Sequence, residues 1–492
     1  MKKQISLLLT LAIFASLVSC GGTPSGTSGT ETSSGTDGQG ADTTAAETEY
    51  APEVVNLDGY EMTVMNYDLS WLTWANTRVV IEEETGDVLE DAIYKRNKKI
   101  EEMYNFTIKV DEVDNVSGKI SKLVQSGDST YDIYAQQEGA SGSFLPYISD
   151  WHNIPGLNLD KPWWNPDATA VYEFDGKQTA LAGNMTLSAA SRAVCMVFNK
   201  KIWSQIGDQD TDLYGLVRDG KWTVDRFIGI AKSTNKDVNG NTEWDEEDIY
   251  GLMFGRGFKG YIASFLCGSD MNFTEKNANG EDEFTLYKNE KGIALLTKLI
   301  DAWTGGNGYE FKKKDDLHGA TPENFFETGH ALFSQRVPND IYKLRSMEDD
   351  IGILPMPKYD EAQENYRSAA WGGAVWTLSR AFDMADAEKL GTALEAMSFY
   401  GYSDVIPVYK EVALKTKTAR DNESADMLDI VFSTIYFDFG TNIMFDSVLA
   451  GGIINSLYHA KSSDSIVSKL EKGKKEIDKY IDDIFEMAAE MQ

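Results

Sequence analysis

The sequence predicts an α/β protein of two or more domains, each built on a mostly parallel sheet flanked by helices. The chain has 492 residues, 42% of them hydrophobic, so it can bury a large core and exceeds the usual size of one domain. Short apolar strands alternate with amphipathic helices from residue 60 onward, and the alternation returns after Arg192. This alternation is typical of βαβ units, in which helices cover both faces of a parallel sheet.

The first group of elements begins near Leu57. Residues 60–66 alternate apolar and polar side chains, which predicts a strand. Residues 87–104 predict a helix, because Asp87 can cap its first N–H groups and Glu90 follows three positions later. Three further elements are predicted: a strand at 106–110, a helix at 116–126 and a strand at 131–134.

The second group repeats this pattern. It comprises strands at 192–198, 250–254 and 331–334 and helices at 223–233 and 288–303. A further strand, 351–354, is stopped by Pro355 and Pro357, which cannot donate to a sheet ladder. A strand at 374–378 follows, and helices predominate from residue 384, the last being amphipathic.

The N-terminus predicts an export signal. Lys2 and Lys3 precede an apolar stretch, 5–18, that is too short to span a membrane comfortably. The run Leu-Val-Ser-Cys ending at Cys20 is similar to a bacterial lipobox, which implies a signal peptide at 1–19, a lipid on the Cys20 thiol and anchoring to the outer face of the cell membrane. The alternative is a plain signal peptide with an incidental cysteine. Residues 20–56 then predict a disordered tether, because its first part is rich in Gly, Ser and Thr.

Charge and cysteine content exclude several classes of protein. The formal net charge of −32 argues against nucleic acid or an anionic surface as partner. After Cys20 only Cys195 and Cys267 remain, both in apolar runs, which predicts buried free thiols and no disulfide framework.

Four segments carry a resemblance to a known family. They are ILPMPKYDEAQENYRS at 353–368, AIYKRNKKIEEMYNFTI at 92–108, RAVCMVFNKKIW at 192–203 and ENFFETGHALF at 323–333. Each resembles, in the right order, a segment of the extracellular solute-binding proteins of bacterial ABC transporters (family 1, saccharide-binding type).

The resemblance implies a two-lobed periplasmic-binding-protein-like fold of type II. In such proteins the chain passes between the lobes three times, here expected near 188–192, 369–373 and 406–416. The N-terminal lobe would comprise 57–189 with 371–412, and the C-terminal lobe 190–370 with 413–492.

The sequence predicts no enzyme. The four histidines are scattered without metal-ligand spacing, and neither a G-x-S-x-G elbow nor a Walker loop occurs. With 78 acidic residues, a glycosidase carboxylate pair is neither excluded nor located, so a secreted glycan-active hydrolase stays the alternative. A surface adhesin without a transporter is a third hypothesis.

The motif Gly-Arg-Gly-Phe-Lys-Gly at 255–260 follows a strand. A dinucleotide site is disfavoured, because the segment after it is too short and apolar for the phosphate-binding helix. We interpret it as a loop at the carboxyl end of a strand, facing the cleft between the lobes. Arg256, Phe258 and Tyr261 are therefore candidates for ligand binding, with structural roles as the alternative.

An acidic loop, 237–248, predicts a structural Ca²⁺ site. Oxygen side chains alternate along it, as six to eight oxygen ligands require. It departs from an EF-hand at Thr242, which replaces a glycine, and at Asp248, which replaces a glutamate. A solvated acidic turn is the alternative. The candidate ligands are Asp237, Asn239, Asn241, Glu243, Asp245 and Glu246.

Aromatic residues in loops after strands predict a saccharide ligand, because sugar rings stack on aromatic planes and their hydroxyls need polar partners. Core packing is the alternative for each ring. Arg192, Arg256 and Arg336 near the expected cleft would suit an acidic sugar. The aromatic candidates are Tyr67, Trp71, Trp74, Trp163 and Trp371.

These observations and the resemblance together predict a substrate-binding lipoprotein of an ABC importer. It would capture an oligosaccharide between two lobes, as a monomer, and deliver it to membrane permease subunits without changing it chemically.

Overall fold

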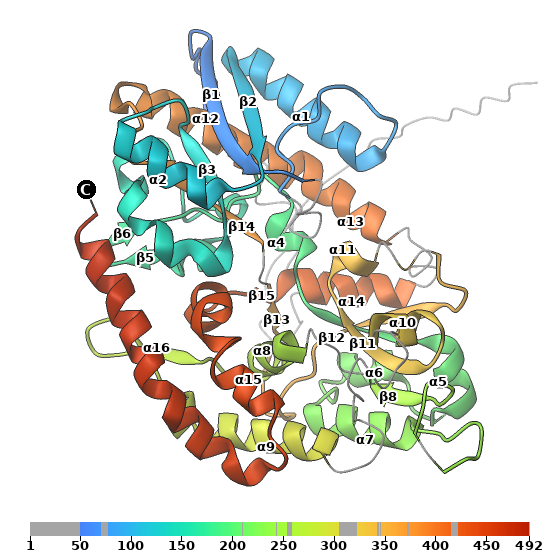
Figure 1. Ribbon diagram of the computed structural model, residues 1–492. Coiled ribbons are helices and arrows are strands. Elements are labelled where there is room, and N and C mark those ends of the chain that lie inside the picture. Colours follow the sequence, from blue (N-terminus) through green and yellow to red (C-terminus); the bar gives the residue numbers. More distant parts are fainter. Residues whose placement is uncertain are drawn as a thin grey trace, which may run out of the picture. The chain divides into compact units, whose positions relative to one another are not determined.

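Two β-sheets organise the fold, and the chain passes repeatedly between them (Figure 1). The structure, a computed structural model, describes residues 50–69, 77–208, 210–242, 244–252, 258–304, 322–341, 344, 346–370, 373–414 and 422–491. Residues 51–492 form one compact unit. None of the helices in the described part is both long enough and apolar enough to cross a membrane.

The first sheet has five strands in the order β2-β1-β3-β14-β4. β1 pairs in parallel with β2 and β3, whereas β14 pairs antiparallel with β3 and β4. Helix α1 follows β1 and begins at the predicted cap, where Asp87 accepts from the N–H groups of Leu89 and Glu90. The bounds are β1 Tyr60–Tyr67, α1 Val88–Tyr104, β2 Phe106–Val113, α2 Val116–Ser126, β3 Ile133–Gln137, β4 Ile148–Ser149, β14 Ala374–Ser379 and α12 Ala387–Tyr400.

The second sheet has four strands in the order β12-β7-β11-β8. β11 is parallel to β8, and β7 is antiparallel to both of its neighbours. The strands are β7 Cys195–Asn199, β8 Tyr250–Leu252, β11 Ala331–Arg336 and β12 Ile351–Pro355. The helices around this sheet are α5 Lys200–Ile206, α6 Leu213–Arg218, α7 Val224–Thr234, α8 Phe258–Gly268, α9 Glu290–Thr304, α10 Pro322–Glu327, α11 Pro338–Ile341 and α14 Asn422–Ser433.

The prediction of mostly parallel sheets is corrected, because both sheets are mixed. One strand carries the chain into a lobe and another carries it out. Because both meet the passages at the same end of the sheet, the two strands run in opposite directions. β7 enters the second sheet at Cys195, and β12 leaves it at Pro355, which is the register partner of Cys195. β14 likewise enters the first sheet where β3 ends, with Ala374 opposite Gln137.

Two of the passages between the sheets lie side by side. The short helix α4, Ser188–Ser191, leads into the first passage, where Ala193 forms an isolated bridge with Ala370 of the returning chain. The Val194 N–H donates to the Ala369 carbonyl at 2.7 Å. Ser188 Oγ accepts from the Ala374 N–H, also at 2.7 Å. Both passages fall where the sequence predicts them. The third was predicted at 406–416, of which 406–414 belong to helix α13 and 415–416 lie outside the described residues.

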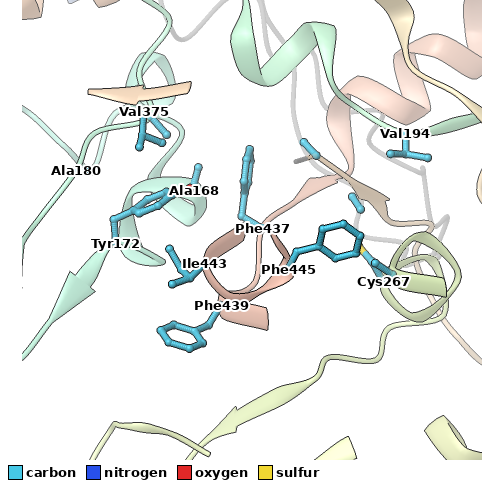
Figure 2. Packing of buried hydrophobic residues seen from close by; sticks show 14 of the residues in the cluster. Ala168, Tyr172, Ala180, Val194, Cys267, Val375, Phe437, Phe439, Ile443 and Phe445 are labelled. Atoms are coloured by element: carbon cyan, nitrogen blue, oxygen red, sulfur yellow. The ribbon is translucent and has the colours of Figure 1, made fainter. Parts of the chain in front are cut away.

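A single cluster of buried apolar side chains includes residues of both sheets. The cluster includes buried side chains of a π-helical segment, η11, Gly440–Leu449. Figure 2 shows Ile443 directed toward Tyr172, whereas Phe445 lies beside Cys267. The segment therefore packs on elements of both groups. The predicted burial of the free thiols of Cys195 and Cys267 is confirmed.

The C-terminal helix α16, Ile466–Ala489, is amphipathic as predicted, with a buried face that includes Leu470, Ile477 and Ile484. Lys177 fixes its end by donating to the carbonyls of Ala488 and Ala489. The remaining elements are η2 Glu138–Tyr147, α3 Pro166–Ala170, β5 Glu173–Phe174, β6 Lys177–Gln178, β9 Thr274–Lys276, β10 Asp282–Phe284, β13 Ser368–Ala369, α13 Ile406–Leu414, β15 Ile435–Tyr436 and α15 Ile453–Tyr458.

Candidate functional site

The carboxyl ends of the parallel strands β1 and β3 lie next to each other in the first sheet. Tyr67 ends β1 and Gln137 ends β3, and the Gln137 N–H donates to the Tyr67 hydroxyl oxygen at 3.2 Å. Burial raises the pKa of Tyr67, so its hydroxyl stays protonated at neutral pH. Ligands of open α/β sheets bind at this edge, so these residues mark a candidate binding site.

A pocket of about 420 Å³ opens beside Gln137. Its wall combines the end of β3, the first turns of η2, the middle of η11 and one face of α16. The lining includes carboxylates, hydroxyls and an amide as well as apolar side chains. It consists of Gln137, Gly142, Ser143, Asp446, Ser447, Tyr480, Asp483, Ile484 and Met487.

Arg192 lies close enough to this region to interact with Asp446. Burial lowers the pKa of Arg192, while Asp340, Glu138, Tyr409 and Asp446 oppose that shift. Partial desolvation raises the pKa of Asp446, and the positive charge of Arg192 opposes this rise. Acidic groups therefore outnumber the arginine around this part of the site.

Glu138 and Asn442 fasten the site to the passages between the sheets. Glu138 is 4% exposed, and its N–H donates to the Gly373 carbonyl at 3.2 Å. Asn442 Nδ2 donates to Glu138 Oε2 at 3.1 Å and to the Ala370 carbonyl at 2.7 Å. Sequence reasoning missed both residues, since no local motif marks a bond between positions so far apart in the chain.

Several predicted site residues lie outside the described part of the chain. They are Trp71, Trp74, Arg256 and Trp371, together with Glu243 of the calcium loop and Cys20. Phe258 is the first residue of helix α8, so a helix begins inside the glycine motif where the sequence predicts a loop. The predicted roles of these residues stay predictions.

Tyr261 and Arg336 lie at the second sheet and away from the pocket lining. The Tyr261 hydroxyl oxygen accepts from the Gln335 N–H at 3.0 Å. Arg336, at the carboxyl end of β11, is 7% exposed, and its guanidinium lies 3.7 Å from Glu327 and over the Phe326 ring. Both side chains are thus engaged in local structure, and the structure does not bring them together with Tyr67.

Trp163 is a core residue of the first lobe. It is 4% exposed, its indole N–H donates to Glu395 at 3.1 Å, and its ring packs edge-on against Phe399 with centroids 5.2 Å apart. This position leaves almost no ring surface for stacking on a ligand, in contrast to the predicted role.

The 237–248 loop is closed by its own hydrogen bonds. Asp237 accepts from the N–H groups of Gly240 and Thr242, and the amides of Asn239 and Asn241 donate to Asp245 at 3.0 and 2.7 Å. Among the described residues, no three His, Cys, Asp or Glu side chains gather in a way that could hold a metal. The side chains of the loop nevertheless converge on Asp245. If the two amides rotated, their oxygens would face the Asp245 carboxylate, as the oxygen ligands of one cation do.

The arrangement of the two sheets and the passages defines the class of fold. Two α/β lobes exchange the chain through neighbouring segments, and the carboxyl ends of β3, β11 and β12 lie beside the passages. This is the two-lobed periplasmic-binding-protein-like fold of type II, as the sequence predicts.

Comparison with solved structures gives the same result. The cyclic alpha-maltosyl-1,6-maltose binding protein of Arthrobacter globiformis matches with a TM-score of 0.56 at 13% identity, over 87% of this chain and 98% of that chain. A cyclo/maltodextrin-binding protein complexed with maltotetraose matches with a TM-score of 0.54 at 14% identity, over 88% and 98%. An ABC substrate-binding protein of Listeria monocytogenes in complex with cycloalternan matches with a TM-score of 0.51 at 12% identity, over 88% and 100%. No protein-family model and no curated protein matches the sequence.

Proposed function

We propose that the chain is the substrate-binding component of an ABC importer and captures an oligosaccharide between its two lobes. The fold supports this function, because proteins that bind maltodextrins and cyclic glucans share it over nearly their whole length. The single observation that carries the proposal is the pocket beside the carboxyl end of β3, where hydroxyl, amide and carboxylate groups accompany apolar side chains. Pyranose rings need this combination of partners.

The ligand is held without a chemical step. In this proposal closure of the lobes excludes water from the cleft, and the closed form docks on permease subunits. The alternative, a secreted glycan-active hydrolase, predicts that incubation of the protein with a glycan it binds releases reducing ends. A reducing-end assay on the same glycans therefore separates the two functions.

Binding is tested by calorimetry and thermal unfolding with a panel of oligosaccharides. At least one should raise the melting temperature and bind with a single-site isotherm. Gln137→Ala should weaken that binding about three- to tenfold, the value of one neutral hydrogen bond. Gln125→Ala, an exposed change on α2, is the matched control and should leave binding unchanged. A panel without any ligand would overturn the proposal.

Anchoring to the membrane is a separate part of the proposal. The run ending at Cys20 supports acylation of its thiol, after which the residues that precede the compact unit, 20–50, act as the tether. Cys20→Ser should move the protein from the membrane fraction to the medium, and mass spectrometry of the N-terminal peptide should show the loss of the lipid. Unchanged membrane retention would exclude the lipid anchor.

Calcium binding at the 237–248 loop is also part of the proposal. Asp237 and Asp245 would supply carboxylate oxygens, with Asn239 and Asn241 turned to present theirs. Calcium should raise the melting temperature, and Asp245→Asn should remove that rise. Asp219→Asn, an exposed change in the same lobe, should retain it. An absence of calorimetric heat with Ca²⁺ would show a solvated turn instead.

A further inference from the structure

The charged side chains that line the pocket are both acidic. Asp446 comes from η11 and Asp483 from α16, and no lysine or arginine is among the lining residues that the structure describes. Asp483 forms an ion pair with Lys479 at 2.5 Å, but both partners are largely solvated, with side-chain exposures of 48% and 72%. Exposed pairs of this kind contribute little, so a ligand can replace Lys479 at this carboxylate.

Arg192 and Arg336, the two described arginines expected to favour an acidic sugar, each lie near acidic groups. Arg192 interacts with Asp340 and Glu138 as well as with Asp446. Arg336 lies beside Glu327, in the second lobe, and does not line the pocket. An anionic sugar placed in the pocket would therefore face carboxylates from two elements, and repulsion between like charges disfavours it.

The rest of the lining suits a sugar ring. Met487 offers apolar contact on α16, and Tyr480, Ser143 and Gln137 carry groups that bind hydroxyls. The Gly142 position allows η2 to approach α16 closely, because a Cβ there would lie 3.1 Å from both Ile484 and the Tyr480 hydroxyl. The pocket thus combines room for a ring with two acidic groups on different elements.

We propose that this pocket binds an ammonium group, so that the captured oligosaccharide carries a sugar with a free amine. The inference rests on the proposed function and adds the chemical class of the ligand. A protonated amine on a sugar ring can donate up to three hydrogen bonds, and bonds from a charged donor to a carboxylate are about twice as strong as neutral ones.

The experiment compares oligosaccharides that differ only in the nitrogen substituent. The probes are glucosamine oligomers, the same oligomers after N-acetylation, and neutral glucose oligomers in α- and β-linked forms, measured by calorimetry at low ionic strength. The free amines should bind about tenfold more tightly than the acetylated and neutral forms, which corresponds to about 1.4 kcal/mol. Added salt should reduce this preference by screening the charges.

Two variants assign the preference to the pocket. Asp446→Asn and Asp483→Asn should each weaken binding of the free amines far more than binding of the acetylated oligomers, so that most of the tenfold preference is lost. Asp482→Asn is the matched control, because it makes the same change of charge on α16 at an exposed position outside the pocket lining. Melting temperatures of the three variants check that each is folded.

Each result has a defined meaning. If neutral or acetylated oligomers bind as tightly as the free amines, or if both Asp variants keep the preference, the inference is overturned while the proposed function stands. If no saccharide binds at all, the proposed function fails together with the inference.

Discussion

The carboxylate of Glu395 accepts the indole N–H of Trp164 at 2.7 Å in the core of the first lobe. The same carboxylate accepts from the Trp163 indole at 3.1 Å and from the N–H and the amide of Asn158. Glu395 is 3% exposed, and its four hydrogen bonds join α12 to the segment before α3. A buried carboxylate is tolerated here because every bond that it needs is made.

Glu395→Gln should destabilise the protein. A glutamine keeps the shape but presents an NH₂ group to one indole N–H, which leaves a buried donor unsatisfied at a cost of about 1–3 kcal/mol. Urea unfolding followed by tryptophan fluorescence measures the free energy of unfolding. Glu388→Gln, exposed on the same helix, is the control. Equal stability of the two variants would contradict this account of the four bonds.

Asn442→Leu should destabilise the junction of the two lobes by about 2–4 kcal/mol. The change removes the donor to Glu138 and to the Ala370 carbonyl, so a buried carboxylate and a carbonyl each lose a partner. Hydrogen exchange should rise at residues 138 and 370 as well as near 442. Asn422→Leu, at the exposed start of α14, should change neither measurement. Unaltered exchange at 370 would show that Asn442 does not fasten the passage.

Asp438 should make stability depend on pH. Burial raises its pKa above the ordinary value of 3.8, although Thr441 and Gly440 donate to it. Because the folded pKa lies above the unfolded one, the buried charge costs stability at neutral pH, and this cost disappears as pH falls through the folded pKa. The stability of the native protein relative to Asp438→Asn should therefore increase between pH 7.5 and pH 4, as measured by urea unfolding. Asp464 is exposed, so the difference in stability between the native protein and Asp464→Asn should not change with pH.

Lys177→Met should loosen the end of α16. The Lys177 ammonium donates to the carbonyls of Ala488, Ala489 and Met491 at the end of α16, where carbonyls lack the N–H of a following turn. Loss of these bonds should lower the free energy of unfolding by about 1–2 kcal/mol. This includes the favourable interaction between a cation and the dipole at a helix C-terminus. Hydrogen exchange of residues 485–491 should accelerate. The exposed change Lys472→Met should leave that exchange as it is, and no difference between the variants would refute the capping role.

The local elements of the fold were predictable from the sequence. The capping group of Asp87 and the alternation at 60–66 predict α1 and β1 near their observed bounds, because both signals lie within one element. Pro355 marks the end of β12 for the same reason, since a proline lacks the N–H that a ladder needs. The passages at 188–192 and 369–373 followed from the resemblance to a known family and not from local chemistry.

The pairing of distant segments was not predictable. The direction of β14 in the first sheet depends on where the chain returns from the other lobe, which no local pattern encodes. For the same reason the role of Glu395 could not be predicted, because its partners lie far away in the sequence, at 158, 163 and 164. Without that contact, Trp163 was interpreted as an aromatic residue in a loop. Glu138 and Asn442 meet across 304 positions, so their bond is visible only in three dimensions.

The place of β14 between β3 and β4 has a consequence for biogenesis. Both neighbours are synthesised long before Ala374–Ser379 emerges, so the nascent chain carries two unsatisfied strand edges until that hexapeptide arrives. Such edges invite aggregation, and sheets completed by remote segments assemble slowly. A polypeptide that stays unfolded until its synthesis is far advanced is well suited to threading through a secretion channel.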